Sequence, residues 1–311
     1  MSERLSISTL EVGAVVRGEL AVTKAEKKVA RNGAYAMLTL TDGELTIVGK
    51  RWQYDDELPQ VGSVLFIIAT VDEYRGTKGV NISRWRAGEL PAEEFAVKGP
   101  IDLEVLREQL SDTLVLIQDS AYRAITEDLF RLHINQWYTK PAAIGVHHNY
   151  VGGLLQHTLE VVTIALAQSV ALESMAGMSI DMDLLMAGAL LHDLGKIRTY
   201  EFQGAAIEMT TEGKLLEHIT MGTHMILSYE TDNSCELYNR KVQKLAHCVA
   251  AHHGCLEWGS PVLAMMPEAM LIHYADQISA KSAMMDAARK QTDREWTDKQ
   301  YQLGVSIYNG K

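Results

Sequence analysis

Histidine and acidic residues recur along the second half of the chain, on predicted helices or at their ends. Five short segments carry them, namely His157, the pair His192-Asp193, His218, the pair His252-His253, and Asp276. Imidazole nitrogens and carboxylate oxygens are suitable ligands for divalent ions such as Mn²⁺, Fe²⁺, Zn²⁺ and Mg²⁺. These residue types therefore predict a metal centre built from several helices.

The adjacent pair His192-Asp193 is the most specific of these features. Two neighbouring residues cannot share one helix face, but at a helix terminus both can reach one ion. The carboxylate of Asp193 could also bridge two ions, which together polarise a phosphate and activate water between them. Lys196 follows one turn later and could hold a substrate phosphate, while Gly195 allows close backbone approach. We therefore expect Asp193 and Lys196 to be catalytic residues of a phosphohydrolase.

Other histidines and a lysine near this pattern have two interpretations each. His147 and His148 could reach a substrate phosphate or could cap the helix that starts near Leu154. Lys281 lies five residues after Asp276 and could bind substrate or simply be solvated. The remaining histidines are interpreted as core or surface residues, because an isolated histidine is seldom a ligand; they are His133, His224, His247 and His273.

The elements that position these residues are predicted from periodicity. Apolar residues at helical spacing predict helices at 102–118, 122–137, 154–175, 181–192, 215–229, 236–252 and 265–290. Asp181 is expected to cap the fourth of them, since an aspartate side chain can accept a hydrogen bond from the first helical turn. Residues 91–100 are interpreted as a linker that precedes this helical part.

The first ninety residues instead show strand and turn signals. Strands are predicted at 15–22, 34–40, 44–52, 64–74 and 78–85, with Asp42-Gly43 as a turn. Five short strands suggest a small antiparallel barrel. Trp52, Tyr74 and Lys78 are candidates for stacking on bases and for contacting phosphates, although aromatic residues in β domains more often belong to the core.

Bulk composition narrows the class of protein. The 311 residues carry a net charge of −11, which provides no general attraction to nucleic acid or to an anionic membrane. Three cysteines without a closely spaced pair do not indicate a disulfide framework. No stretch of about 18 uninterrupted apolar residues is present, and the first residues do not resemble a signal peptide. We expect a cytoplasmic protein that does not enter a membrane.

The ordered motif resembles the HD-domain superfamily of metal-dependent phosphohydrolases. Within that superfamily, several segments resemble YhaM-type 3′–5′ exoribonucleases; these segments are HHNYVGGLLQHTLEV, GALLHDLGKI, TTEGKLLEHITMG, AHHGCLEWGSPV and MLIHYADQISAK. The resemblance spans roughly residues 10–290 and implies that the barrel is an OB-fold.

The resemblance also implies a ligand set and a domain plan. One ion would be held by His157, His192, Asp193 and Asp276, and a second by Asp193, His218 and His252, with His253 left as a supporting or substrate-binding alternative. The expected fold is α+β and multidomain: a five-stranded OB-fold barrel at 1–90, a linker and connecting helix at 91–118, an all-α HD domain at 119–290, and a tail at 291–311.

The implied activity is metal-dependent 3′–5′ hydrolysis of single-stranded RNA to nucleoside 5′-monophosphates, with single-stranded DNA as an alternative substrate. Two divalent ions per site are expected, with Mn²⁺ favoured over Fe²⁺, Mg²⁺, Co²⁺ or Zn²⁺, and homo-oligomerisation is left open. The alternative is an HD phosphohydrolase that acts on a small or cyclic nucleotide. A third hypothesis is a non-catalytic nucleic-acid-binding protein with a structural metal.

Overall fold

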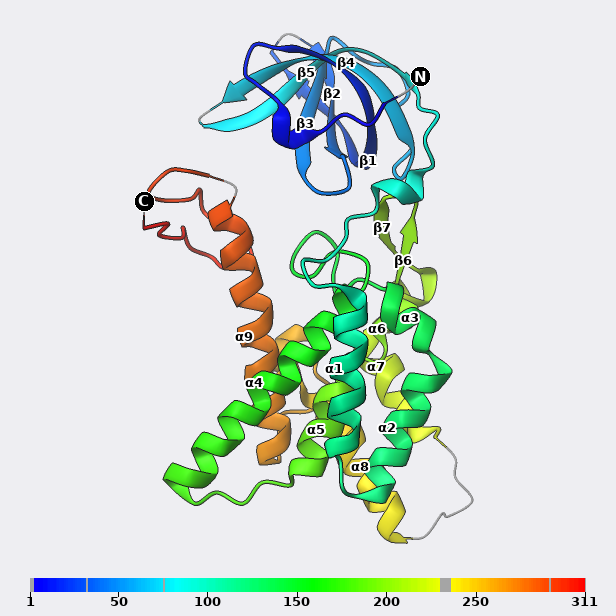
Figure 1. The fold of residues 1–311 in the computed structure, drawn as a ribbon, viewed down its shortest axis with the longest axis vertical. Helices are drawn as coiled ribbons and strands as arrows, with labels where there is room; N and C mark the ends of the chain where they lie inside the picture. The colour runs from blue at the N-terminus through cyan, green and yellow to red at the C-terminus, as the bar shows by residue number, and fades with distance from the viewer. Residues whose placement is uncertain (1–2, 32, 75, 230–235, 291, 311) are drawn as a thin grey trace. The chain divides into compact units, whose positions relative to one another are not determined.

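The computed structural model describes residues 3–31, 33–74, 76–229, 236–290 and 292–310. The chain divides into two compact units, drawn in Figure 1. The first comprises Met1–Lys98, Phe202–Glu208 and Met285–Lys311, and the second comprises Gly99–Glu201 and Met209–Met284.

The first unit is built on a closed five-stranded barrel with neighbour order β1-β2-β3-β5-β4. Its strands are β1 (Val15–Ala30), β2 (Gly33–Thr41), β3 (Thr46–Trp52), β4 (Val64–Tyr74) and β5 (Thr77–Ala87). The long β1 pairs with β4 through its first half and with β2 through its second, and β3 pairs with β5 in parallel. The predicted five-stranded barrel, followed by a helical domain, is confirmed.

Apolar and polar residues alternate along the strands, and the apolar ones fill the barrel interior with aliphatic side chains. Leu20, Leu38 and Ile67 are fully buried there. Gly49 on β3 permits this packing, because a Cβ at that position would lie 2.7 Å from Ile82 Cδ1. The barrel is therefore a filled core, and any ligand must bind on its outside.

Strand β1 runs further than the predicted 15–22. Residues up to Ala30 continue to pair with β2 down to Gly33, although their side chains are mostly polar and partly exposed. Backbone pairing persists where the apolar alternation has ended, so the hydrophobic pattern missed this part. A second pair, β6 (Tyr200–Gln203) and β7 (Ala206–Met209), was also not predicted, because each strand has only four residues.

The helical elements are α1 (Leu103–Leu116), α2 (Ser120–Leu132), α3 (Ile134–Thr139), α4 (Gly153–Ala176), α5 (Met182–Leu191), α6 (Lys196–Thr199), α7 (Thr211–Leu227), α8 (Glu236–Ala251) and α9 (Pro267–Lys290). The single helix predicted at 122–137 is wrong, because the chain leaves helical geometry at His133 between α2 and α3. Asp181 caps α5 as predicted by accepting a hydrogen bond from Leu184 N.

Helices of the second unit enclose one apolar core. Trp137, Tyr122 and Leu155 are among its largest fully buried side chains. Every residue of α5 from Leu184 to Leu191 is buried, so the helix ends inside the protein. The residues that follow α5, His192 and Asp193, are thereby placed in the interior.

Two segments expected to be linker and tail have defined structure. The 91–100 segment contains a 3₁₀ helix, η2 (Ala92–Phe95), whose Phe95 is fully buried against Ala21 and Val64. The final segment folds back on itself, with Thr297 N donating to the carbonyl of Ile307. Cys248 and Cys255 are free thiols, and Cys235 lies outside the described residues.

Among the described helices, α4 is long and apolar enough to cross a membrane by length and composition alone. A core helix of a soluble protein passes the same test. The first ten residues of α4, Gly153–Val162, are buried apart from Glu160. The finding is therefore weak evidence for a membrane span.

Candidate metal centre

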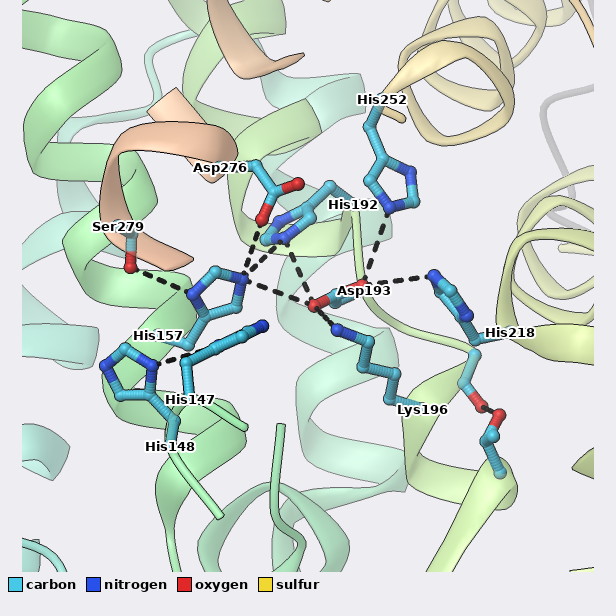
Figure 2. A network of polar contacts seen from close by, with 12 residues as sticks. His147, His148, His157, His192, Asp193, Lys196, His218, His252, Asp276 and Ser279 are labelled. Atoms are coloured by element: carbon cyan, nitrogen blue, oxygen red, sulfur yellow. Dashed lines mark hydrogen bonds and ion pairs between the residues drawn. The ribbon is translucent and has the colours of Figure 1, made fainter. Parts of the chain in front are cut away.

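Asp193 lies at the centre of the predicted ligand set, and its two carboxylate oxygens face two different groups of residues (Figure 2). Oδ2 lies 3.4 Å from His157 Nε2 and 3.3 Å from His192 Nε2. Asp276 completes this first group, with its Oδ1 3.1 Å from His157 Nε2. These four side chains come from α4, from the turn after α5, and from α9.

The second group lies on the other side of the same carboxylate. Asp193 Oδ1 is 3.6 Å from His218 Nε2 on α7 and 3.6 Å from His252 Nε2 at the end of α8. Figure 2 shows both imidazoles directed at Asp193. Their arrangement is that of a carboxylate able to bridge two ions.

The donor atoms fit divalent ions in spacing and in chemistry. Ligand atoms about 2.0–2.2 Å from one tetrahedral ion are roughly 3.3–3.6 Å apart, close to the distances around Asp193. Within the described residues, no hydrogen-bond partner is found for the buried atoms Asp193 Oδ1, His218 Nε2 and His252 Nε2. Buried polar atoms without partners are rare and require an explanation such as a bound ion.

Hydrogen bonds at Nδ1 fix how four imidazoles point. His192 Nδ1 donates to the carbonyl of Ala189 at 2.8 Å, and His252 Nδ1 donates to that of Val249 at 2.7 Å. A carbonyl can only accept, so the proton of each neutral ring lies on Nδ1 and the lone pair of Nε2 faces the centre.

The other two imidazoles are held by side chains that sequence reasoning missed. Ser279 Oγ donates to Glu160 Oε2 at 2.7 Å and therefore accepts from His157 Nδ1 at 3.0 Å. Glu217 Oε2 lies 3.3 Å from His218 Nδ1. Glu217 directly precedes its ligand in the chain, but no sequence pattern pairs Ser279 with Glu160, 119 residues apart.

Backbone strain accompanies the placement of His218. Glu217 has φ 58° and ψ 156°, which interrupts α7 with a kink. This region of backbone space is costly for any residue except glycine, and such strain concentrates at functional sites. The kink turns His218 toward Asp193 while bringing the Glu217 carboxylate to Nδ1.

Lys196 is buried beside the ligands. Its Nζ lies 2.6 Å from Asp193 Oδ2. Burial would lower the pKa of Lys196, but the charge of Asp193 raises it above the usual value. Lys196 is thus a fixed cation in the site, next to the carboxylate that we expect to bridge the ions.

Burial and neighbouring charges shift the pKa values of Asp193 and His157 in directions that favour a bound cation at this centre. Burial would raise the pKa of Asp193, yet the charge of Lys196 and the contacts with His192 and His157 hold it well below its usual range. Burial would likewise lower the pKa of His157, but its hydrogen bonds to Asp193 and Asp276 raise it to about 9. A cation that binds Nε2 of His157 would therefore have to displace the proton that this raised pKa favours.

His253, the predicted alternative to His252, lies next to the second group of residues. His253 lies beside His218 and His252, with ring centroids 5.0 and 4.5 Å away, but it is partly exposed and its Nδ1 contacts the carbonyl of Trp258. The geometry places His252, not His253, against Asp193.

The two histidines before α4 lie beside the first group. The ring of His147 is 5.0 Å from that of His157, and Figure 2 shows it pointing toward Lys196. His148 adopts φ 47° and donates from Nε2 to Glu160 Oε2 at 3.0 Å. Burial lowers the pKa of His147 to about 2, so this ring is neutral.

The described contacts of Lys281, Trp52 and Lys78 are made with residues outside the predicted ligand set. Lys281 Nζ lies 5.8 Å from the ring centroid of Trp258. Trp52 is half exposed on the barrel and donates from Nε1 to Asn81 Oδ1, and Tyr74 is exposed. Lys78 Nζ donates to the carbonyl of Leu10 at 2.8 Å, so it is engaged in the fold.

The histidines interpreted as core or surface residues have other partners. His273 Nδ1 donates to the carbonyl of His252, and His247 Nε2 accepts from Met265 N. His224 lies beside Ser228, and burial lowers the pKa of His133. None of these contacts involves the carboxylate of Asp193.

Comparison with known proteins agrees with this geometry. The HD domain family matches residues 154–281, a range that contains both groups of predicted ligands. A 3′–5′ exoribonuclease YhaM from Halalkalibacterium halodurans is 32% identical over 289 residues, covering 89% of this chain and 87% of that protein.

The chain belongs to the YhaM exoribonuclease family.

The predicted family is therefore confirmed, and so is the predicted class of enzyme, a hydrolase. Two solved structures match parts of the chain at low similarity. The second OB-fold domain of replication protein A from Methanococcus maripaludis is 17% identical with a TM-score of 0.24, covering 28% of this chain and 95% of that one. A putative aspartyl-tRNA synthetase from Leishmania major Friedlin is 14% identical with a TM-score of 0.21, covering 51% and 39%.

Proposed function

We propose that this YhaM-type hydrolase is a metal-dependent 3′–5′ exoribonuclease that cuts single-stranded RNA to nucleoside 5′-monophosphates. One observation carries the proposal, namely the Asp193 carboxylate whose two oxygens face two separate groups of ligands. The related protein from Halalkalibacterium halodurans bears the name 3′–5′ exoribonuclease, which supports the direction and the substrate class.

Two divalent ions, with Mn²⁺ as the first choice, would supply Lewis acidity and an activated water at this centre. His157, His192, Asp193 and Asp276 would hold one, and Asp193, His218 and His252 the other. The hydrogen bonds at Nδ1 keep the four imidazoles oriented before any ligand arrives, so the site loses little entropy on binding.

The chain's own cation has a separate task. Lys196 can donate from Nζ to a nonbridging oxygen of the scissile phosphate and so stabilise the charge that develops in the transition state. Its burial keeps the ammonium group dry and therefore strong as an electrostatic partner. His147, neutral and directed toward Lys196, can donate a hydrogen bond to the same phosphate.

The barrel would bind the strand upstream of the cut. Trp52 is a half-exposed ring whose orientation is fixed by Asn81 and by Tyr35, with ring centroids 4.6 Å apart, and single-strand binders use such rings for stacking. We further propose four functional parts: a nucleic-acid-binding barrel at 1–90, a linker and connecting helix at 91–118, a catalytic domain at 119–290 and a tail at 291–311. We also propose a cytoplasmic location and activity on single-stranded DNA. Homo-oligomerisation stays open.

The test is incubation of metal-stripped protein with 5′-labelled single-stranded RNA, with and without Mn²⁺. We expect a ladder that shortens from the 3′ end only with Mn²⁺, and nucleoside 5′-monophosphates as products. Asp193→Asn should be inactive, while Asp112→Asn, which alters an exposed carboxylate on α1, should match the wild type. Hydrolysis of free or cyclic nucleotides without cleavage of RNA would instead establish the alternative function, which the net charge of −11 favours.

A further inference from the structure

A short turn between α8 and α9 is tied to the second group of ligands. It contains the 3₁₀ helix η3 (Leu256–Trp258). His253 Nδ1 donates to the carbonyl of Trp258 at 2.5 Å, so the residue after the ligand His252 holds the end of this turn. Trp258 is therefore anchored at a fixed position relative to the His252 and His218 side of the centre.

The turn is also packed closely against α9. His273 Nδ1 donates to the carbonyl of His252 at 2.8 Å. Gly254 has φ 76°, and a Cβ there would lie 2.4 Å from His273 Cε1, so only glycine fits without a shift. These contacts make the turn a rigid support, because both its backbone path and its neighbour are specified.

The indole of Trp258 is largely uncovered on this support. Its exposed fraction is 53%. Lys281 Nζ lies 5.8 Å from the ring centroid, and the ring of His273 lies 6.4 Å away. Lys281 belongs to α9, the helix that also carries the predicted ligand Asp276, so an aromatic face and a cation lie together on elements that adjoin His253 and Asp276 in the chain.

We propose that Trp258 and Lys281 form the subsite for the 3′-terminal nucleotide, with the base stacked on the indole and a backbone phosphate paired with the ammonium group. This inference rests on the proposed exoribonuclease function. Aromatic faces with nearby cations bind single-stranded nucleic acid in this way, and stacking accepts every base because every base has a π-face.

The subsite accounts for two requirements of the reaction. A nuclease that removes nucleotides one at a time must hold each new terminal base without reading its identity, and stacking without base-edge hydrogen bonds does so. A chain with net charge −11 must also place local positive charge where the strand approaches, and Lys281 provides it beside the Trp258 ring.

The test compares two single-stranded RNAs that differ only at the 3′ end, where one has an intact nucleotide and the other an abasic one. For the wild type with Mn²⁺, we expect kcat/KM of the first cleavage to be about tenfold higher on the intact strand, as base stacking on an aromatic ring allows. Trp258→Ala should reduce this ratio to near one, and Trp258→Phe should largely restore it.

A matched control uses another tryptophan of equal exposure, Trp296, which is also 53% exposed. Trp296→Ala should keep the tenfold ratio. A wild type that cleaves both strands equally, or a Trp258→Ala variant that keeps the tenfold ratio, would overturn the subsite alone. A wild type that cleaves neither strand would overturn the proposed function and the subsite with it.

Discussion

The backbone of Gly195 lies against the carbonyl of His218, so closely that a Cβ on residue 195 would be 1.9 Å from that oxygen. Gly222, one turn after His218, packs against the same glycine, with a Cβ position 3.1 Å from Gly195 N. The glycine of the HDLGK segment therefore brings α7 close enough for His218 to reach Asp193, which differs from the substrate approach expected from the sequence.

Gly195→Ala should push α7 away and separate His218 from Asp193. We expect the free energy of unfolding to fall by about 1–3 kcal/mol, as for other overpacked sites, and the second ion to be lost. Urea denaturation and metal content per chain measure the two effects. Gly177→Ala is the control, because a Cβ there meets nothing within 4 Å and only its φ of 62° is unfavourable; it should keep both ions, and equal metal loss in both variants would contradict the account.

Asp193→Asn and Asp276→Asn should differ in metal stoichiometry. Asp193 faces both groups of histidines, whereas Asp276 contacts only His157 of the first. After desalting from Mn²⁺, we expect about two ions per chain in the wild type, about one in Asp276→Asn and fewer in Asp193→Asn. Elemental analysis gives the numbers, and equal stoichiometry in the two variants would argue against the bridging role.

Lys196→Met should weaken the metal-free protein more than the metal-loaded one. The variant leaves the buried carboxylate of Asp193 without its ion-pair partner, which costs about 3–5 kcal/mol in a dry site. Bound ions would compensate that charge, so Mn²⁺ should raise the Tm of Lys196→Met more than that of the wild type. Its kcat should also drop about 100-fold, the usual cost of losing one donor to the transition state. An equal rise of Tm in both proteins would show that Lys196 and the metals do not share this carboxylate.

Glu217→Gly should make the protein more stable and less active at once. Glycine adopts φ 58° without strain, so the free energy of unfolding should rise by about 1 kcal/mol. His218 would lose the carboxylate at its Nδ1, and loss of such a supporting group typically costs 10–100-fold in activity or metal affinity. Thermal unfolding and RNA cleavage are measured together, with Lys214→Gly, at an exposed position near the start of α7, as the control. A stable variant with full activity would remove Glu217 from the site.

The sequence indicated which residues gather around Asp193 better than it indicated the side chains that support them. His157, His192, Asp193, His218, His252 and Asp276 stand in an ordered motif, and all six lie within 3.6 Å of another member through contacts of Asp193 or His157. Glu160 and Ser279 could not be found in this way, because their pairing depends on how α4 and α9 pack.

Short sequence patterns predicted a structural feature correctly only where neighbouring residues alone determine that feature. Asp181 was recognised as a cap, since capping needs only a side chain and the next turn. The break at His133 and the extension of β1 to Ala30 were missed, because tertiary packing and strand pairing decide them. Trp258 was not singled out either, as its significance comes from His253 and Lys281.

The shared role of Asp193 is tested most directly by anomalous diffraction from crystals soaked in Mn²⁺. We predict two anomalous peaks about 3.5–4 Å apart, one on each side of the Asp193 carboxylate, with Asp276 beside the first and His218 and His252 beside the second. A single peak, or two peaks of which only one contacts Asp193, would contradict it.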